Sequence, residues 1–252
     1  MIDGPTYLLM QVRDQDDPMR EHEIACFTRA LQCRREQLAI HDLLSGAPSP
    51  ARLDAADVVL LGGSGDYSVA RGGPWLPPAL DAMVALYETS KPTFASCFGF
   101  QTMARALGGE VVTDHERAEV GAVPMNLTDE GARDPIFGSL DRRFYGQSGH
   151  EDIVVSLPAD AVLLASSDQV ENEAFRFEGK PIYCTQFHPE LAAADLVARI
   201  SRYPVYLPLC GASTIEELAA ITPETPDTEA LLLRFVRHVL GSDAVPEGAE
   251  TG

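Results

Sequence analysis

Two short segments of the sequence carry residue types that can perform nucleophilic catalysis. Cys97 lies in Ala-Ser-Cys-Phe-Gly directly after the apolar run at 92–94, and His188 and Glu190 lie in Gln-Phe-His-Pro-Glu. A cysteine between small residues, after a strand and before a helix, is typical of a nucleophile elbow that exposes its sulfur. The positive end of that helix and a neighbouring imidazole would favour the thiolate, which is the attacking species. With His188 as base and Glu190 orienting it, the three residues would form a Cys-His-Glu triad.

A glycine-rich loop supplies a third feature of the same chemistry. The apolar run at 58–61 leads into Gly-Gly-Ser-Gly at 62–65, which predicts a buried strand followed by a loop of accessible backbone amides. Acyl transfer requires hydrogen-bond donors where negative charge develops on the substrate oxygen. We assign these donors to the amides of Gly63 and Phe98, so that no side chain contributes to the oxyanion hole.

In their order, these motifs resemble those of the class I (triad) glutamine amidotransferases. That family has a Gly-Gly loop, then a Gly-x-Cys-x-Gly-His-Gln elbow, then Gln-Phe-His-Pro-Glu, and the resemblance runs over about residues 5–200. It implies a thioester between Cys97 and the γ-glutamyl carbonyl of glutamine, release of ammonia, and hydrolysis by water that His188 activates. It also assigns the glutamine head group to a set of residues around the elbow and a later strand end: Gln101, Gly149, His150, Glu151 and Asp152. For His150, a surface ion pair with neighbouring carboxylates is the alternative.

The sequence departs from the family pattern at two positions of the elbow. The first elbow glycine is Ala95, which would narrow the approach if that position requires a positive φ. The usual histidine after Gly99 is Phe100, which is expected to make one side of the pocket more apolar. Neither departure removes a member of the triad, so substrate choice is affected more than mechanism.

Alternating helical and strand patterns predict an α/β fold, with a mostly parallel central sheet, helices on both faces and antiparallel additions. From residue 110 to 179 the pattern changes to short strands that suggest the antiparallel additions. The expected strands are 6–12, 38–44, 57–62, 92–96, 120–127, 153–157, 162–166, 174–177 and 182–187, and the expected helices are 19–37, 77–89, 98–107, 190–201, 215–220 and 228–240. We expect one domain over 1–241, a family insertion at about 203–226 and a disordered tail at 242–252. The insertion would cover the mouth of the site, form a subunit contact or simply pack.

Composition excludes several classes of function. The net charge is −19 without a cluster of lysine or arginine, which argues against nucleic acid as a partner. No apolar run approaches the length of a membrane span and no signal peptide is recognisable, so a cytoplasmic location is expected. Five cysteines without a Cys-x-x-Cys pair argue against a disulfide framework or structural zinc, and all except Cys97 are expected to be inert. We expect no metal, because the His-x-Glu pair lacks a third ligand at a recognisable spacing, and no cofactor or nucleotide, because the glycine loop lacks the end of a P-loop.

Three functions remain open on this basis. The first is a glutamine amidotransferase subunit that releases ammonia for a separate synthase, since no ATP-binding synthetase domain is recognisable in the chain. The second is a stand-alone hydrolase of γ-glutamyl amides or peptides that uses the same triad. The third is a catalytically silent binding module, against which the joint presence of Cys97, His188 and Glu190 argues.

Overall fold

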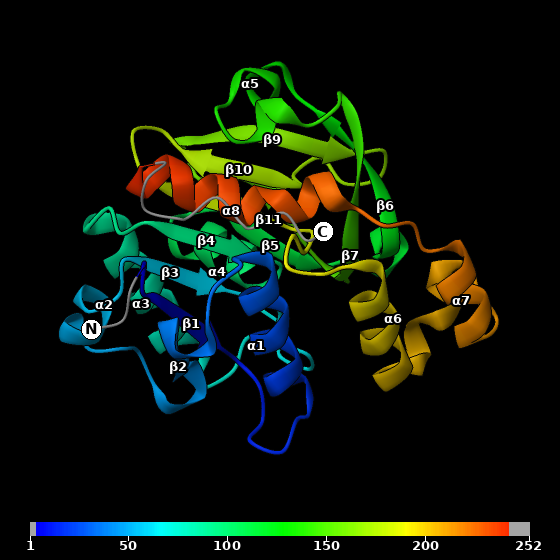
Figure 1. Ribbon diagram of the computed structural model, residues 1–252, viewed down its shortest axis with the longest axis horizontal. Helices are drawn as coiled ribbons and strands as arrows, with labels where there is room; N and C mark the ends of the chain where they lie inside the picture. The colour runs from blue at the N-terminus through cyan, green and yellow to red at the C-terminus, as the bar shows by residue number, and fades with distance from the viewer. Residues whose placement is uncertain (1–3, 242–252) are drawn as a thin grey trace.

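A nine-stranded mixed sheet organises the protein, in the order β2-β1-β3-β4-β11-β10-β9-β6-β7 (Figure 1). The structure is a computed structural model that describes residues 4–241. The parallel strands at one edge are β2 (Leu38–Asp42), β1 (Tyr7–Gln11), β3 (Val58–Leu61), β4 (Thr93–Ser96) and β11 (Ile182–Thr185). The antiparallel strands that follow are β10 (Ala174–Phe177), β9 (Ala161–Ser167), β6 (Glu119–Leu127) and β7 (Arg143–His150). A separate pair joins β5 (Glu110–Thr113) to β8 (Asp152–Ser156). This is the predicted fold class.

Helices cover both faces of the sheet, because successive residues of each buried strand point to opposite sides. Leu60 and Leu61 of β3, for example, belong to different core clusters. The first cluster includes residues of α1 (Met19–Ala30) and α8 (Pro226–Leu240), and the second includes residues of α2 (Pro50–Asp54), α3 (Leu76–Glu88) and α4 (Phe98–Ala106). In Figure 1, α8 crosses in front of the sheet while α3 and α4 lie behind it.

Several local expectations were wrong or incomplete. The helix predicted over 19–37 ends at Ala30, because Gln32 takes a left-handed φ of 51° and turns the chain. Strand β2 ends at Asp42 rather than at 44, and β11 ends at Thr185 rather than at 187. Regular elements that the sequence analysis did not predict are α2, β5, β7, α5 (Asp129–Arg133) and the 3-10 helices η1 (Arg35–Gln37), η2 (Leu43–Ser45), η3 (His115–Arg117) and η4 (Phe137–Ser139).

The segment predicted as an insertion folds beside α6 (Ala193–Arg202). It contains the 3-10 helix η5 (Pro204–Cys210) and α7 (Ile215–Ile221), and a small separate core joins them to α6. Figure 1 shows α6 and α7 at one side of the molecule, beyond β6 and β7. Val205 of η5 is 75% exposed. The segment therefore packs on α6 and also exposes an apolar side chain to solvent.

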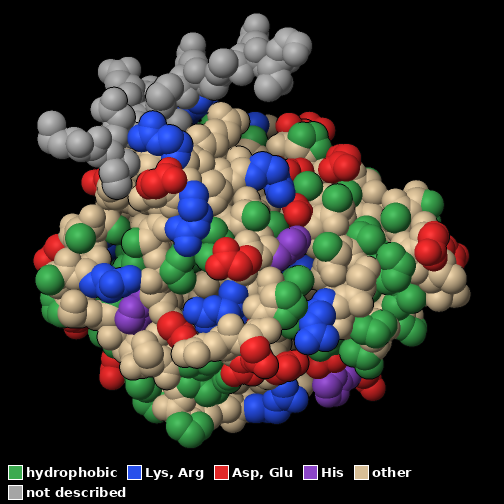
Figure 2. Space-filling model, turned by 60° about the horizontal axis from the view of Figure 1, so that its bottom comes forward, with side chains coloured by type: hydrophobic (Ala, Val, Ile, Leu, Met, Phe, Trp, Pro, Cys, Tyr) green, Lys and Arg blue, Asp and Glu red, His purple; other side chains and the backbone are tan. Residues whose placement is uncertain are grey.

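The surface carries charges of both signs. Figure 2 shows acidic and basic side chains interspersed on one face, without a continuous basic stripe on that face. None of the helices within residues 4–241 is both long enough and apolar enough to cross a membrane. The tail expected to be disordered, at 242–252, lies outside the described residues.

The elbow depends on the absence of a side chain at Gly99. A Cβ atom at this position would lie 2.5 Å from Leu61 Cβ and 3.0 Å from Ala95 Cβ. We therefore expect Gly99→Ala to lower the free energy of unfolding by about 1–3 kcal/mol, because overpacking outweighs the gain in helix propensity. Urea denaturation followed by circular dichroism would measure the change.

Gly149→Ala is the matched control for that substitution. No atom lies within 4 Å of a Cβ built there, so its expected effect is within about 0.5 kcal/mol. Equal losses of stability for the two variants would contradict the overpacking argument.

Candidate active site

Cys97 occupies a sharp turn between β4 and α4. It is the N-cap residue of α4, with φ 51° and ψ −102°, a conformation that few residues other than glycine adopt. Its amide donates to the Thr185 carbonyl of β11 at 2.8 Å, which ties the turn to the sheet. Ala95 lies within β4 and has no positive φ, so alanine fits the backbone at that departure from the family pattern. The backbone of the chain thus forms the predicted nucleophile elbow.

His188 and Glu190 follow β11, the strand next to β4 in the sheet. His188 Nδ1 lies 2.6 Å from Glu190 Oε1, and both side chains are almost fully buried. Glu190 Oε2 also accepts from the hydroxyl of Ser96, the residue before Cys97, at 3.0 Å. The carboxylate is therefore held on both oxygens and fixes the orientation of the imidazole.

Charge within the site favours a protonated imidazole. Burial alone would lower the pKa of His188, but Glu190 and Cys97 outweigh it and raise this pKa to about 9. Burial alone would raise the pKa of Glu190, whereas His188 and Arg199 together lower it below its usual value. The arrangement is that of an ion pair in which Cys97 lies close enough to His188 to affect its protonation.

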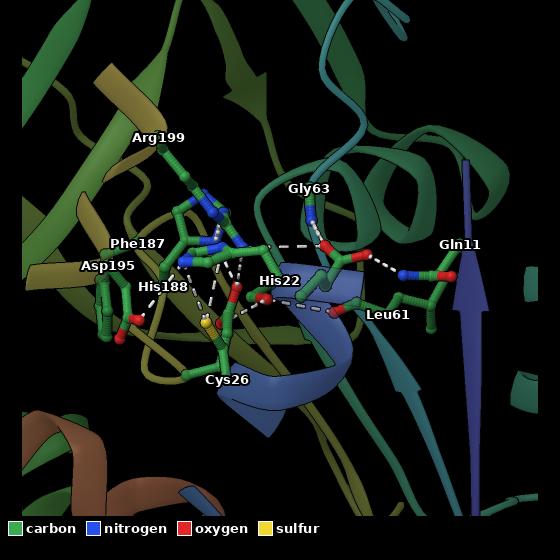
Figure 3. Close-up of polar contacts among 12 residues, drawn as sticks. Gln11, His22, Cys26, Leu61, Gly63, Phe187, His188, Asp195 and Arg199 are labelled. Carbon is green, nitrogen blue, oxygen red and sulfur yellow. Dashed lines mark hydrogen bonds and ion pairs between the residues drawn. The ribbon is translucent and has the colours of Figure 1, made fainter. Parts of the chain in front are cut away.

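A second buried carboxylate, Glu23 of α1, lies near the His188–Glu190 pair. Arg199 of α6 connects the two, because its guanidinium lies 3.3 Å from His188 Nδ1, 3.6 Å from Glu190 Oε1 and 3.9 Å from Glu23 Oε1. Glu23 Oε2 accepts from Gln11 Nε2 at 2.8 Å and lies 3.5 Å from Arg13 Nε. Figure 3 shows the Gln11 side chain and the Gly63 amide directed to this same carboxylate, with Arg199 above His188.

The two backbone amides expected to stabilise an oxyanion have different surroundings. The Gly63 amide donates to Glu23 Oε1 at 3.1 Å, so in this arrangement its proton is directed to that carboxylate. A Cβ at the preceding Gly62 would lie 2.3 Å from the same oxygen, which explains why the loop requires glycine there. Phe98 is the first residue of α4, where an amide has no acceptor within the helix.

A cavity brings most of the predicted site residues together. It is lined by Cys97, His188, Gly63, Gln101, Gly149, His150, Glu151 and Asp152. Gln101 Nε2 donates to the Asp152 carbonyl at 2.8 Å and to Gln186 Oε1 at 3.2 Å, which leaves its Oε1 as the atom available to a ligand.

The Asp152 carboxylate is engaged within the protein. Its Oδ1 accepts from Thr113 at 2.6 Å, and its Oδ2 accepts from Ser68 Oγ at 2.7 Å and the Ala70 amide at 3.0 Å. It therefore anchors the loop after Gly63 to the β7–β8 turn, which forms another wall of the cavity.

Two other residues differ from what the sequence suggested. His150 is only 5% exposed and lies between two buried carboxylates, so its interpretation as a surface ion pair was wrong. Phe100 is fully buried in the core, where its ring packs on Phe175 at 5.1 Å between centroids. It does not line the cavity, so the expectation that Phe100 makes the pocket more apolar was also wrong.

The segment predicted as an insertion contributes to the cavity wall. Tyr203 and Tyr206 line it together with Arg71 from the loop that Asp152 anchors. Of the three alternatives for residues 203–226, this placement is compatible with a cover over the mouth of the site, and the subunit contact stays a prediction.

Burial disfavours the thiolate form of the other four cysteines. Burial raises the pKa of Cys26 to about 12 and that of Cys33 to about 11, and the fully buried Cys184 also has a strongly raised pKa. Burial likewise raises the pKa of Cys210. These values support the expectation that the four are inert.

Sequence reasoning missed Glu23, Arg199 and Ser96. The sequence contains a signal for Glu23, which lies four residues before the buried Phe27 and thus on the apolar face of α1. Arg199 similarly follows Leu196 by three residues on the buried face of α6. A charged residue on an apolar helix face indicates a buried partner, which the sequence cannot identify.

Comparisons with known proteins agree with this geometry. The family model for "Glutamine amidotransferase class-I" matches residues 23–199. The chain therefore belongs to the class-I glutamine amidotransferase family. "GMP synthase [glutamine-hydrolyzing]" of Vibrio atlanticus is 32% identical over 184 residues, which cover 70% of this chain and 34% of that protein. A subunit of the GMP synthase (glutamine-hydrolysing) of Methanothermobacter thermautotrophicus is 35% identical over 120 residues, or 48% of this chain and 62% of that protein.

Similar solved structures support the fold. A glutamine amidotransferase of Thermotoga maritima superimposes with a TM-score of 0.72 at 20% identity, covering 93% of this chain and 98% of its own. A glutamine amido transferase of Methylobacillus flagellatus gives a TM-score of 0.68 at 20% identity. The match covers 99% of this chain and 98% of the Methylobacillus chain. The chain spans about a third of the length of the Vibrio GMP synthase, so the match concerns one part of that protein.

The imidazole of His188 provides a direct test of the site electrostatics. Glu190 stabilises the imidazolium, so replacing its charge by the neutral amide in Glu190→Gln should lower the pKa of His188 from about 9. We expect an NMR titration of the ring nitrogens to show this shift toward lower pH. Glu151→Gln is the control, since Glu151 lines the cavity but is not among the groups that set the His188 pKa. An unchanged midpoint in Glu190→Gln would contradict the described ion pair.

Proposed function

We propose that this protein hydrolyses the side-chain amide of glutamine through a thioester on Cys97 and releases ammonia for a separate synthase subunit. The observation that carries the proposal is the placement of Cys97 on a left-handed elbow beside an imidazole that Glu190 holds at 2.6 Å. Cys97, His188 and Glu190 are then the catalytic triad.

The first half-reaction forms the thioester. The Cys97 thiolate attacks the amide carbon of glutamine, and the carbon–nitrogen bond breaks after His188 donates its proton to the leaving nitrogen. A pKa of about 9 keeps His188 protonated at neutral pH, as this step requires. The Phe98 amide is one donor to the oxyanion, and Gly63 can be the second only after its amide leaves Glu23.

The second half-reaction hydrolyses the thioester. Neutral His188, which has given its proton to ammonia, removes a proton from water, and the hydroxide attacks the thioester carbon. Glutamate leaves and the Cys97 thiolate is restored beside a protonated His188. Gln101 Oε1 and the cavity wall from Gly149 to Asp152 are proposed to hold the glutamine head group, with the Asp152 side chain acting through the loop that it anchors.

The proposed use of ammonia by a separate subunit rests on the relatives. The Methanothermobacter relative is one subunit of a glutamine-hydrolysing GMP synthase, and this chain spans only a third of the Vibrio enzyme. A synthase that accepts ammonia is thus the class of partner that we propose.

One observation favours a second candidate, a stand-alone γ-glutamyl amide or peptide hydrolase. Tyr203, Tyr206 and Arg71 extend the lining of the cavity beyond Cys97, and they could contact a leaving group larger than ammonia. The triad chemistry would be unchanged. Comparing kcat/KM for glutamine with that for γ-glutamyl anilides and dipeptides separates the two candidates.

The experiment that tests the proposal combines labelling with an activity assay. An electrophilic glutamine analogue should add once to the wild-type protein, peptide mapping should locate the adduct on Cys97, and the protein should release ammonia from glutamine. Labelling that persists in Cys97→Ala would contradict the assignment of the nucleophile. Neither labelling nor hydrolysis of any γ-glutamyl compound, with or without a synthase partner, would favour a silent binding module.

A further inference from the structure

Three buried side chains form a cluster beside the cavity, and its two carboxylates have no role in the proposed reaction. Glu119 of β6 is paired in register with His150 at the end of β7, and Glu173 lies directly before β10. Their side chains are no more than 2% exposed. His150 and Cys97 line the same cavity, so this cluster, Glu119–His150–Glu173, borders the cavity that contains the Cys97 thiol.

The polar atoms of this cluster lack ordinary partners. Glu119 Oε1 accepts from Ser167 at 2.5 Å, but Glu119 Oε2, both oxygens of Glu173 and both nitrogens of His150 have no hydrogen bond. Within residues 4–241, no lysine or arginine forms an ion pair with either carboxylate. Buried carboxylates are normally paired or coordinate a metal, and a lone imidazole does not balance two of them.

The separations within the cluster discriminate between possible ligands. His150 Nε2 lies 3.4 Å from Glu119 Oε2 and 3.9 Å from Glu173 Oε1, and one ligand atom from each residue lies within 4.8 Å of the others. Acceptors around an ammonium ion or a water, with hydrogen bonds of about 2.9 Å in tetrahedral directions, would lie about 4.7 Å apart. Tetrahedral zinc, with bonds of about 2.0–2.2 Å, places its ligand atoms about 3.3–3.6 Å apart.

The direction of the contacts agrees with a shared ion. At 3.4 Å the Nε2 and Oε2 atoms are close, yet they do not form a hydrogen bond with one another. Lone pairs of metal ligands converge on the ion rather than on one another. An imidazole and carboxylates are common ligands of first-row divalent metals.

We propose that Glu119, His150 and Glu173 bind one divalent first-row metal ion. The 3.4 Å separation fits Zn²⁺, and the 3.9 Å separation requires Glu173 to move slightly closer to His150. His150 also lines the cavity, which provides the route by which the ion would enter. The ion would neutralise the two carboxylates and join β6, β7 and the start of β10 at the cavity wall. This departs from the sequence expectation of no metal, which considered only ligands near the His188–Glu190 pair.

A second cluster, His22–Cys26–Asp195, does not have these properties. Asp195 Oδ2 accepts from Arg29 at 2.6 Å and from the Ala192 amide at 2.8 Å, so a cation already pairs with it. Burial also raises the pKa of the Cys26 thiol to about 12, which opposes thiolate ligation.

The competing account of the Glu119–His150–Glu173 cluster is a proton shared between the two carboxyl groups. Burial and the neighbouring Glu119 raise the pKa of Glu173 well above its usual value, which is compatible with a neutral Glu173 that donates to Glu119. A shared proton predicts no metal, so metal binding separates the two accounts.

The test is equilibrium binding of Zn²⁺ to chelator-treated protein, with bound metal counted by mass spectrometry. All variants are made in a Cys97→Ala background, so that the catalytic thiol cannot contribute a ligand. We expect one equivalent of Zn²⁺ in this background, and affinity lower by at least about tenfold in Glu119→Gln and in Glu173→Gln. Glu151→Gln, beside His150 but outside the cluster, should bind as the background does.

Thermal unfolding gives a second readout that is independent of catalysis. Zn²⁺ should raise the midpoint temperature of unfolding of the background protein and of Glu151→Gln but not that of Glu173→Gln. The reason is that an ion that binds only the folded state stabilises the folded protein. Glu173→Gln removes a buried ionisable group, so it should fold without metal. Less than about a tenth of an equivalent in the background protein, or equal binding by Glu173→Gln, would overturn the proposal in favour of the shared proton.

Discussion

Replacing Cys97 by alanine should lower kcat for glutamine hydrolysis by at least about 10⁴-fold, because no other cysteine among the described residues lines the cavity to form the proposed thioester. His188→Gln should cause a loss of similar size, since it removes both the acid for ammonia and the base for water. The double variant should be no slower than the worse single variant, because residues of a triad act as one unit. Steady-state ammonia release, with the synthase partner where one is required, would measure these rates.

The control for these rates is His238→Gln. His238 is exposed on α8 and is not one of the residues that line the cavity, so this variant should retain wild-type activity. If the loss of kcat in the double variant equalled the product of the two single losses, Cys97 and His188 would act independently, which would contradict a shared mechanism. Substantial activity in Cys97→Ala would contradict it as well.

Glu23→Ala should be the most destabilising single substitution in the site region. Glu23 is fully buried and contacts Gln11, Gly63, Arg13 and Arg199 at 2.8–3.9 Å. Removing one partner of a buried ion pair is strongly destabilising, and here two buried guanidinium groups lose a shared counter-charge and keep only Asp17 and Glu190. The free energy of unfolding should therefore fall by about 3–5 kcal/mol. Denaturant unfolding would measure this loss, and Glu23→Gln should lose less because its amide oxygen can still accept from the Gly63 amide.

Glu21→Gln is the matched control on the same helix. Glu21 is exposed in the first turn of α1, and its replacement should change stability by no more than about 0.5 kcal/mol. A loss in Glu23→Ala that is no larger than that in Glu21→Gln would show that the arginines find other partners.

The elements closest to the catalytic chemistry were predictable because their causes are local. A run of apolar residues such as Val58–Leu61 forms a strand that is buried on both faces, and small residues around Cys97 permit the sharp turn before α4. Parallel neighbours β4 and β11 then bring Cys97 and His188 to the same edge of the sheet. The order of these motifs in the chain was enough to indicate the class of fold.

Substrate-side predictions were less complete because they depend on distant partners. Asp152 was expected at the substrate, but Thr113, Ser68 and the Ala70 amide engage its carboxylate. Those partners lie 39 to 84 positions away in the sequence, and no local pattern relates them to Asp152. Phe100 likewise faces the core because of the direction in which α4 leaves the elbow.

By itself, the sequence determined the fold class, the elbow at Cys97 and the His-Pro-Glu segment, since strand burial, turn geometry and residue chemistry act over a few neighbouring positions. Only the tertiary structure decided that Glu23 and Arg199 lie behind the triad, that the Gly63 amide is directed to Glu23, and that Glu119, His150 and Glu173 meet. Electrostatic and hydrogen-bonding partners are selected by proximity in space. That proximity follows from the packing of helices on the sheet and from strand register, which residue spacing alone does not specify.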